Sequence, residues 1–356
     1  MKEHPIGLYQ KTDLTPPTAK KVPKKLVMHG DTRVDNYFWL NQREDQAVID
    51  YLNAENAYTD KMTAHLKPLQ EELFEEIKGR IKQDDTSVPY RENGYYYISR
   101  YEKGQEYPIY SRKKGSLDAE EEIMLNVNEL AKDYDYYAVG GRNVSQDNKI
   151  LCFAEDTLSR RIYTLRFKNL ETGEMLEDVI PGSAGGAVWA NDNRTVFYTT
   201  REEGTLRAYK IFRHQLGTPI SEDVEVWHET DNTFSCFATK TKSNKYIVVG
   251  SYQTLSQEYR VLEADNPTGE FRVIQPRERN LEYSVAHFGD KFYIRTNLDA
   301  KNFRLMSTPE NATNKENWTE VIAHRSDVLL EDMDIFKDYL VVSERKDGIM
   351  QLRVRP

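Results

Sequence analysis

One serine stands in a setting that could make it a nucleophile. It is Ser183, in the stretch "PGSAGG" at residues 181–186. A serine nucleophile elbow has the pattern Gly-x-Ser-x-Gly and lies on a tight turn between a buried strand and a helix. Here Pro181 occupies the position of the first glycine, and the following "AVWANDNRTVFY" has the pattern of strand, turn and strand. We therefore interpret the stretch as a flexible loop between sheets and assign no catalytic residue.

Other residues that often carry chemistry do not form a known site pattern. None of the seven histidines lies in a His-Glu-x-x-His motif, no phosphate-binding loop is present, and "AVGGRN" lacks the spacing of a dinucleotide loop. Cys152 and Cys236 are 84 residues apart, which fits neither a disulfide framework nor a metal site. The sequence thus predicts no metal and no cofactor. It predicts two buried free thiols on strands and a reducing, cytoplasmic location.

Charged residues close to turns are the remaining candidates. They occur in "YDYYAVGG" and "AEDTLSRR" and are Asp135, Glu155, Asp156, Arg160 and Arg161. One interpretation is that some of them pair with another domain. The other is that they form an ordinary charged surface, where an ion pair contributes only about 0–1 kcal/mol. The local pattern leaves both interpretations open.

The elements that position these residues begin with a polar tail and a helical arm. Residues 1–28 carry six lysines and two acidic residues, and they lack the apolar segment that a signal peptide needs. Three large side chains, Tyr37, Phe38 and Trp39, then follow among charged residues. Further on, apolar residues recur at three- and four-residue spacing, which predicts two amphipathic helices. We assign residues 1–81 to a basic tail and this arm.

From about residue 90 the periodicity changes to two. Short segments rich in aromatic and β-branched residues alternate with polar turns, which indicates an all-β region over residues 82–356. A turn of Asn or Asp recurs before one strong strand of each group, at Asn93, Asn148, Asn193, Asn244, Asp290 and Asp338. The spacings are 55, 45, 51, 46 and 48 residues. Such a period predicts the blades of a β-propeller. An irregular β-sandwich with several hairpins is the alternative.

The last repeat is shorter than the others. Only 18 residues follow Asp338, so we expect about six blades, of which the last has about three strands. We expect the ring to stay open and the final sheet to lack its outer strand. Such a sheet carries a row of unpaired backbone groups, and here only Arg353 and Arg355 would protect that row.

Many ordered segments carry a resemblance to a known family. They include "HGDTRVDNYFWL", "YLNAENAY", "AEDTLSRRIYTLRFKNLETG", "VWANDNRTVFY", "IFRHQLGTP", "KNFRLMST" and "LVVSERKDGIMQLR". Together they resemble the oligopeptidase B branch of the prolyl oligopeptidase family of serine peptidases. The resemblance covers nearly the whole chain from about residue 26. It implies a helical arm, a seven-bladed propeller and a C-terminal α/β-hydrolase domain that holds a Ser-His-Asp triad, and it implies cleavage of short peptides after Lys or Arg without a cofactor.

This sequence resembles only the arm and most of the propeller, so the catalytic domain is expected to lie outside it. The resemblance makes that domain the partner of the charged candidates above and of Tyr37, Phe38 and Trp39, which would anchor the arm on it. Side chains of the arm should then expose an unusual apolar area; these are Phe38, Trp39, Val48, Leu52, Leu73 and Ile77. Alternatively, residues 29–81 simply cap the propeller.

The implied role of the propeller is to filter substrates, admitting short peptides and excluding folded proteins. The alternative is a non-catalytic propeller that serves as a scaffold for other proteins. A net charge of −9 argues against nucleic acid as a partner and favours short basic peptides. No apolar run approaches the roughly 20 residues of a membrane helix, so no membrane partner is predicted.

Overall fold

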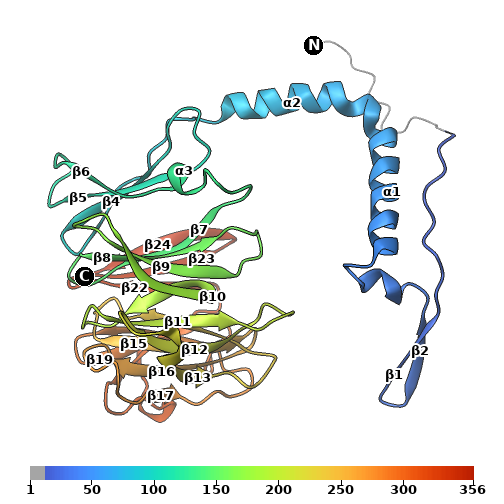
Figure 1. Cartoon of the computed structure of the whole chain (residues 1–356). Helices are drawn as coiled ribbons and strands as arrows, with labels where there is room; N and C mark the ends of the chain where they lie inside the picture. The colour runs from blue at the N-terminus through green and yellow to red at the C-terminus, as the bar shows by residue number, and fades with distance from the viewer. Residues whose placement is uncertain (1–12) are drawn as a thin grey trace. The chain divides into compact units, whose positions relative to one another are not determined.

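The computed structural model describes residues 13–356 and divides into two compact units (Figure 1). The first unit ends at Gln83 and the second begins at Asp84. Part of the predicted basic tail, including Lys2 and Lys11, lies outside the described residues.

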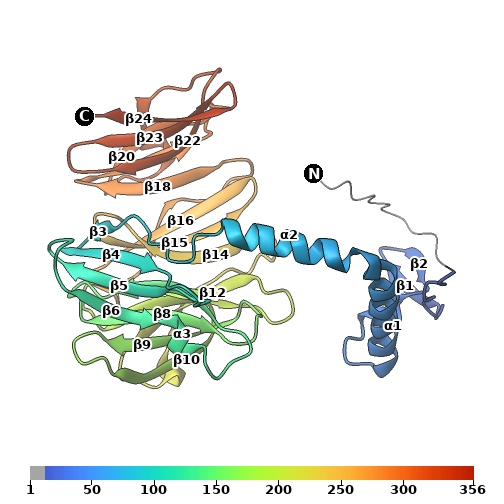
Figure 2. The ribbon, with the colours of Figure 1, turned by 90° about the horizontal axis from the view of Figure 1, so that it is seen from above.

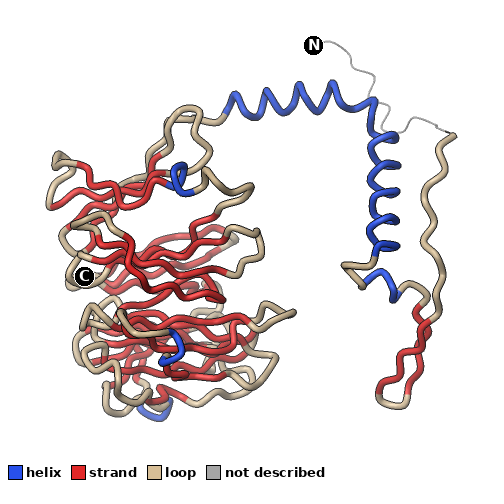
Figure 3. Tube along the Cα trace, viewed as in Figure 1, coloured by secondary structure: helices blue, strands red, loops and turns tan. Residues whose placement is uncertain are grey.

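The first unit is a hairpin followed by two helices (Figure 3). Its elements are β1 (Lys24–Met28), β2 (Asp31–Asp35), the 3-10 turn η1 (Phe38–Asn41), α1 (Gln46–Thr63), η2 (Ala64–Leu66) and α2 (Lys67–Arg80). The Asp45 carboxylate accepts a hydrogen bond of 2.8 Å from the backbone N–H of Ala47, and thereby caps α1. Pro68 stands in the first turn of α2, where a missing N–H has no cost.

The two helices bury very little within the described structure. Val48 is the buried residue of α1, and α2 has none. The exposed apolar side chains are Leu52 (54%), Leu73 (45%), Phe74 (60%), Ile77 (57%) and Ile81 (63%). The expectation of an exposed Val48 was therefore wrong, because this side chain is only 3% exposed. Leu73, Phe74, Ile77 and Ile81 recur at helical spacing and form one exposed apolar face along α2, called the stripe of α2 below.

The second unit consists of antiparallel sheets that succeed one another along the chain (Figure 2). The first sheet contains β3 (Tyr90–Glu92), β4 (Tyr95–Arg100), β5 (Ile109–Lys114) and β6 (Glu121–Asn126), and is followed by the short helix α3 (Val127–Leu130). The next two blades contain β7 (Ala138–Val144), β8 (Ile150–Asp156), β9 (Tyr163–Asn169), β10 (Met175–Trp189), β11 (Thr195–Arg201), β12 (Ala208–Gln215) and β13 (Val224–His228), with η3 (Ile220–Glu222) before β13.

These seven strands form one continuous sheet because β10 serves two blades. It pairs with β9 between Met175 and Ser183, and with β11 between Ser183 and Trp189, with bulges in both ladders. Its first half is therefore the outer strand of the second blade, and its second half is the inner strand of the third.

Three further sheets complete the unit. They are β14 (Ser235–Lys240), β15 (Tyr246–Gln253), β16 (Ser256–Glu263) and β17 (Arg272–Gln275); β18 (Tyr283–Phe288), β19 (Lys291–Thr296), β20 (Arg304–Pro309) and β21 (Thr319–Ile322), with η4 (Lys315–Asn317) before β21; and β22 (Leu329–Ile335), β23 (Leu340–Lys346) and β24 (Ile349–Arg355). The propeller prediction is thus confirmed, including a last blade of three strands, and the sandwich alternative is not.

Packing of each sheet on the next builds the core. Five clusters of buried side chains each draw residues from two consecutive blades. In the cluster between the second and third blades, Phe167 and Trp189 meet edge to face with ring centroids 5.9 Å apart. Between the first and second blades, Tyr97 packs with Phe153. Truncating one buried Phe to Ala at such a site costs about 3–5 kcal/mol, so each junction stabilises both of its blades.

The repeated turns explain why Asn marked the blades in the sequence. Asn93, Asn148, Asn193 and Asn244 have φ of 44°, 65°, 57° and 60°, a left-handed conformation that Asn tolerates better than most residues. In the fifth blade Gly289 takes this conformation, with φ 64°, immediately before the predicted Asp290.

The same turns also hydrogen-bond to one another from blade to blade. The bonds run from Asn93 Nδ2 to Gln146 O (2.6 Å), from Asn148 Nδ2 to Asn93 O (3.2 Å), from Asp147 N to Asn193 Oδ1 (2.9 Å) and from Asn191 Nδ2 to Asn244 O (3.1 Å). They connect the first four blades in succession at their turns.

A histidine takes over this role between the fourth and fifth blades. His287 Nδ1 lies 2.8 Å from Ser243 Oγ, and its Nε2 lies 2.5 Å from Glu310 Oε1. Lys245 completes the group with an ion pair of 2.5 Å to Glu310. The order Ser–His–Glu is that of a hydrolase triad, but Ser243 lies in a turn between two strands and no helix follows it. We therefore interpret Ser243, His287, Glu310 and Lys245 as a polar link between the fourth and fifth blades.

The outer strand of the last sheet is unpaired on one side in the described structure. β24 pairs with β23 alone, and its side chains Ile349, Met350, Leu352 and Val354 are 65%, 53%, 70% and 59% exposed. Of the two expected protecting residues, Arg353 forms an ion pair with the buried Glu344, whereas Arg355 forms none with any residue of 13–356. β23 is paired on both sides, with β22 and with β24, so the free edge of the sheet belongs to β24.

We expect a gradient of amide hydrogen exchange across the propeller. Amides at Ile150–Phe153 and Val196–Tyr198 should exchange slowly because their strands are internal and buried, whereas those of Ile349–Arg355 should exchange fastest among the strands. Hydrogen exchange followed by mass spectrometry or NMR measures this. Equal protection of β24 and β8 in dilute monomer would show that another segment covers the edge.

The junction at His287 should make stability depend on pH. Burial lowers the pKa of His287 below its ordinary value of 6.5, so the unfolded chain binds a proton that the folded chain resists. The contribution of His287 is therefore complete above pH 6.5 and declines as the pH falls below it. His287→Gln should lower Tm near neutral pH, yet flatten the fall in Tm between about pH 7.5 and about pH 5.5.

The matched control is His228→Gln, because the side chain of His228 is 40% exposed. This variant should keep the slope of the parent protein. Equal slopes for the parent and for His287→Gln would contradict the assignment.

Candidate functional site: the propeller channel and its walls

The innermost strands of the first four blades line a cavity of about 760 Å³, called the channel below. β3, β7, β14 and the second half of β10 supply most of its wall. Most residues that line the wall are polar or have small side chains. Examples are Thr239, Lys240 and Thr241 from β14 and the turn after it, and Ala184, Gly186 and Ala187 from β10. The residues that line this channel include no cluster of catalytic side chains.

Glycines keep the strands of the channel wall close together. A Cβ atom at Gly140 or Gly141 of β7 would lie 2.9 or 2.8 Å from the carbonyl oxygen of Gly185 in β10. Side chains there would push the second and third blades apart. The "AVGGRN" stretch is thus a close contact between strands, in agreement with its exclusion as a dinucleotide loop.

Ser183 is part of β10 and not of a loop. It is fully buried, it faces Tyr163 on one side and Thr200 on the other, and its Oγ accepts a hydrogen bond of 2.9 Å from Gly185 N. The predicted flexible loop was wrong because the glycines produce bulges that let one strand pass from blade to blade. The Ser183 hydroxyl lies inside a sheet, whereas a nucleophile elbow exposes its serine on a tight turn before a helix.

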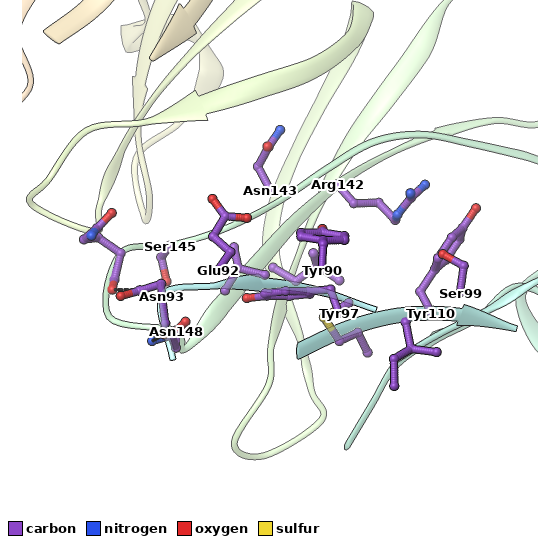
Figure 4. Close-up of a pocket in the computed structure, with 15 residues that line it drawn as sticks. Tyr90, Glu92, Asn93, Tyr97, Ser99, Tyr110, Arg142, Asn143, Ser145 and Asn148 are labelled. Atoms are coloured by element: carbon purple, nitrogen blue, oxygen red, sulfur yellow. Dashed lines mark hydrogen bonds between the residues drawn. The ribbon is translucent and has the colours of Figure 1, made fainter. Parts of the chain in front are cut away.

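A second, smaller cavity of about 120 Å³ lies between the first and second blades (Figure 4). Tyr90 and Tyr97 stack in it with ring centroids 5.2 Å apart, and the Arg142 guanidinium lies 3.6 Å from the centre of the Tyr110 ring. Several residues line both this pocket and the channel, so the two are contiguous; they are Tyr90, Glu92, Asn93, Asn143, Val144 and Gln146.

The loop after β8 holds three of the charged candidates. Asp156 is only 2% exposed; its two carboxylate oxygens accept hydrogen bonds from Leu158 N (2.9 Å) and Arg161 N (2.7 Å). Ser159 and Arg161 have φ of 57° and 56°, so the carboxylate stabilises a strained loop. The side chains of Arg160 and Arg161 remain exposed.

Glu155 has partners inside the second blade. It accepts hydrogen bonds from Arg166 Nε (2.7 Å) and from the Tyr137 hydroxyl (2.5 Å). Burial and this carboxylate together raise the pKa of Tyr137 far above its ordinary value. Asp135, by contrast, is exposed. The structure therefore places two candidate carboxylates inside the propeller, as supports of local structure, and leaves Asp135 and the two arginines at the surface.

The aromatic candidates of the arm make contacts within the first unit. Trp39 Nε1 donates a hydrogen bond of 2.8 Å to Lys20 O, and its ring meets Tyr51 of α1 edge to face at 6.3 Å. Lys24 Nζ lies 3.5 Å from the centre of the Phe38 ring. Tyr37 is 42% exposed. Trp39 thus fixes the segment that precedes α1.

Sequence reasoning missed a buried ion pair between the third and fourth blades. Glu229 is fully buried and accepts two hydrogen bonds, of 3.1 and 3.2 Å, from the guanidinium of Arg277, which also lies over Phe234. The partners are 48 residues apart, and nothing in the local pattern around either residue indicates the other.

Within residues 13–356, no three His, Cys, Asp or Glu side chains are placed to hold a metal ion together. In the same residues, no helix combines the length and the apolar character needed to cross a membrane. The two cysteines are free and buried, and burial raises the pKa of Cys236 to about 12.

Comparison with known proteins completes the description. Residues 16–356 match the family model of the prolyl oligopeptidase N-terminal β-propeller domain. Dipeptidyl aminopeptidase BI of Pseudoxanthomonas mexicana is 42% identical, over 98% of this chain and 51% of that protein, and protease 2 of Moraxella lacunata is 32% identical, over 95% and 50%. Oligopeptidase B from Leishmania major has a similar structure, with a TM-score of 0.88 and 29% identity over 96% of this chain and 50% of that one.

The chain spans about half the length of the relatives that it matches. The match to the family model covers nearly the whole sequence, and the observed blades agree with it. The chain therefore belongs to the prolyl oligopeptidase family of serine peptidases, of which it forms the N-terminal β-propeller region.

Proposed function

We propose that this chain is the arm and the substrate-filtering propeller of an oligopeptidase B-like serine peptidase that cleaves short peptides after Lys or Arg. A C-terminal α/β-hydrolase domain, beyond these 356 residues, supplies the Ser-His-Asp triad and the oxyanion hole. The chain alone is then inactive and needs no cofactor. Its two buried free thiols favour the cytoplasm as its location.

The channel along the inner strands is the observation that carries this proposal. Its walls are the close-packed inner strands of the first four blades. In the proposed role a short extended peptide enters the channel and a folded protein does not. The net charge of −9 favours the approach of basic peptides. The propeller thereby selects substrates by size before any chemistry occurs.

The relatives favour a second specificity. The relative at 42% identity is named a dipeptidyl aminopeptidase, so release of dipeptides from a free N-terminus is the competing activity. A non-catalytic scaffold is the remaining alternative, and it requires that no catalytic domain acts with this propeller.

Two surfaces are assigned to the interface with the catalytic domain. One consists of the exposed apolar stripe of α2 and, separately, of Tyr37 with the half-buried Phe38 and Trp39 before α1. The other is the charged surface of the second blade, where Asp135, Arg160 and Arg161 are exposed. Glu155 and Asp156 contribute to it by holding the segments that carry these charges.

Hydrolysis assays separate these functions. The 356-residue chain alone should not cleave any peptide amide reporter, whereas the full-length protein should cleave reporters with Arg or Lys before the scissile bond. Activity on N-blocked reporters supports the oligopeptidase, and activity confined to reporters with a free N-terminal dipeptide supports the aminopeptidase. Turnover by the chain alone that is lost in Ser183→Ala would contradict the proposal.

The stripe on α2 should bind a hydrophobic dye in the isolated chain. Replacing two exposed residues, Phe74→Ser with Ile77→Ser, should lower the dye fluorescence by about half because apolar surface is removed. A control pair on the opposite side of the helix, Glu72→Ser with Glu75→Ser, perturbs the same helix and should leave the signal unchanged. A parent chain that binds no dye would instead favour an arm that caps the propeller.

A further inference from the structure

We propose that the small pocket between the first and second blades binds a short zwitterionic peptide, with the ammonium group at Glu92 and the carboxylate at Arg142. The proposal rests on the function above, because it places a peptide site on the wall of the channel through which substrates and products would pass. It names the chemical class that the site recognises, which is a di- or tripeptide with both termini free.

The two charges at the pocket have no ionic partner of their own. In the described part of the chain, Glu92 forms no ion pair, and neither does Arg142, whose contacts are the Tyr110 ring and a long hydrogen bond of 3.3 Å to Gly140 O. Figure 4 shows Tyr90 between them, with Glu92 on one side and Arg142 on the other. Both side chains are exposed, so a single ligand that carries both charges can reach both residues at once.

One hydrogen-bond acceptor inside the pocket also lacks a donor. Asn148 Oδ1 is buried without a partner, while its Nδ2 donates to Asn93 O at 3.2 Å. A buried acceptor without a donor is costly. An ammonium group has three donors, so the N-terminus of a peptide can bond to the Glu92 carboxylate and still offer donors to other acceptors of the pocket wall. This places the N-terminus of the peptide at the end of the pocket nearest the repeated turns.

The aromatic rings supply the remainder of the site. The stacked Tyr90 and Tyr97 offer an apolar surface for the peptide backbone or a side chain. Burial raises the pKa of Tyr90, Glu92 adds to the rise and Arg142 opposes it, so both charges act on this one ring. The cavity of about 120 Å³ has room for a short peptide but not for a folded chain.

The test uses the 356-residue chain and alanyl-alanine in three forms: free, N-acetylated and C-amidated. Binding is followed by NMR at the side-chain amides of Asn143, Gln146 and Asn148, which line the pocket. The free dipeptide should bind about tenfold more tightly than either blocked form. Glu92→Gln should weaken the free dipeptide about tenfold and leave the N-acetylated form unchanged. Arg142→Gln should weaken the free dipeptide about tenfold and leave the C-amidated form unchanged.

The control is Glu120→Gln, which changes the net charge as Glu92→Gln does but removes an exposed carboxylate that does not line the pocket. It should bind all three forms as the parent chain does. Equal affinity for all three forms, or shifts that map outside the pocket, would overturn the proposal. Its failure is distinct from failure of the proposed function, which shows as a full-length protein without peptidase activity.

Discussion

The packing of each sheet against the next is the constraint on which the rest of this structure depends. A single blade is too small to bury its own apolar side chains, so Phe167 and Trp189, or Tyr97 and Phe153, reach their buried positions only when neighbouring blades meet. The channel exists because the inner strands of the first four packed blades line it. The strand β10, shared by two blades, and the glycine contact at Gly140 fix how closely the walls approach.

Polar groups complete each junction. The Asn turns bond from blade to blade among the first four blades, and His287 with Glu310 takes their place at the next junction. The pocket proposed to bind peptides lies at the first of these junctions, where Asn148 uses its amide nitrogen for the neighbouring turn while its buried amide oxygen has no donor. Stability and recognition therefore draw on the same turn residues.

The sequence predicted the features that depend on local chemistry. The left-handed turns favour Asn or Gly, and this made the blade period visible at Asn93 and Asn148. Features that depend on distant partners could not be predicted. The Glu229–Arg277 pair joins residues far apart in the chain. Asp156 looked like a surface charge, but its carboxylate turns back on its own loop. Ser183 looked like a loop because the bulges that keep it in β10 need both neighbouring strands.

Entry of a peptide into the channel is the central claim, and paramagnetic NMR measures it most directly. A short basic peptide that carries a nitroxide label should broaden the amide signals of inner-strand residues such as Asn143, Gly186 and Ala238, which line the cavity. It should leave the outer strands β13 and β17 sharp, because a nitroxide inside the channel lies nearer the inner strands. Broadening confined to the outer strands, with the inner strands unaffected, would contradict the account.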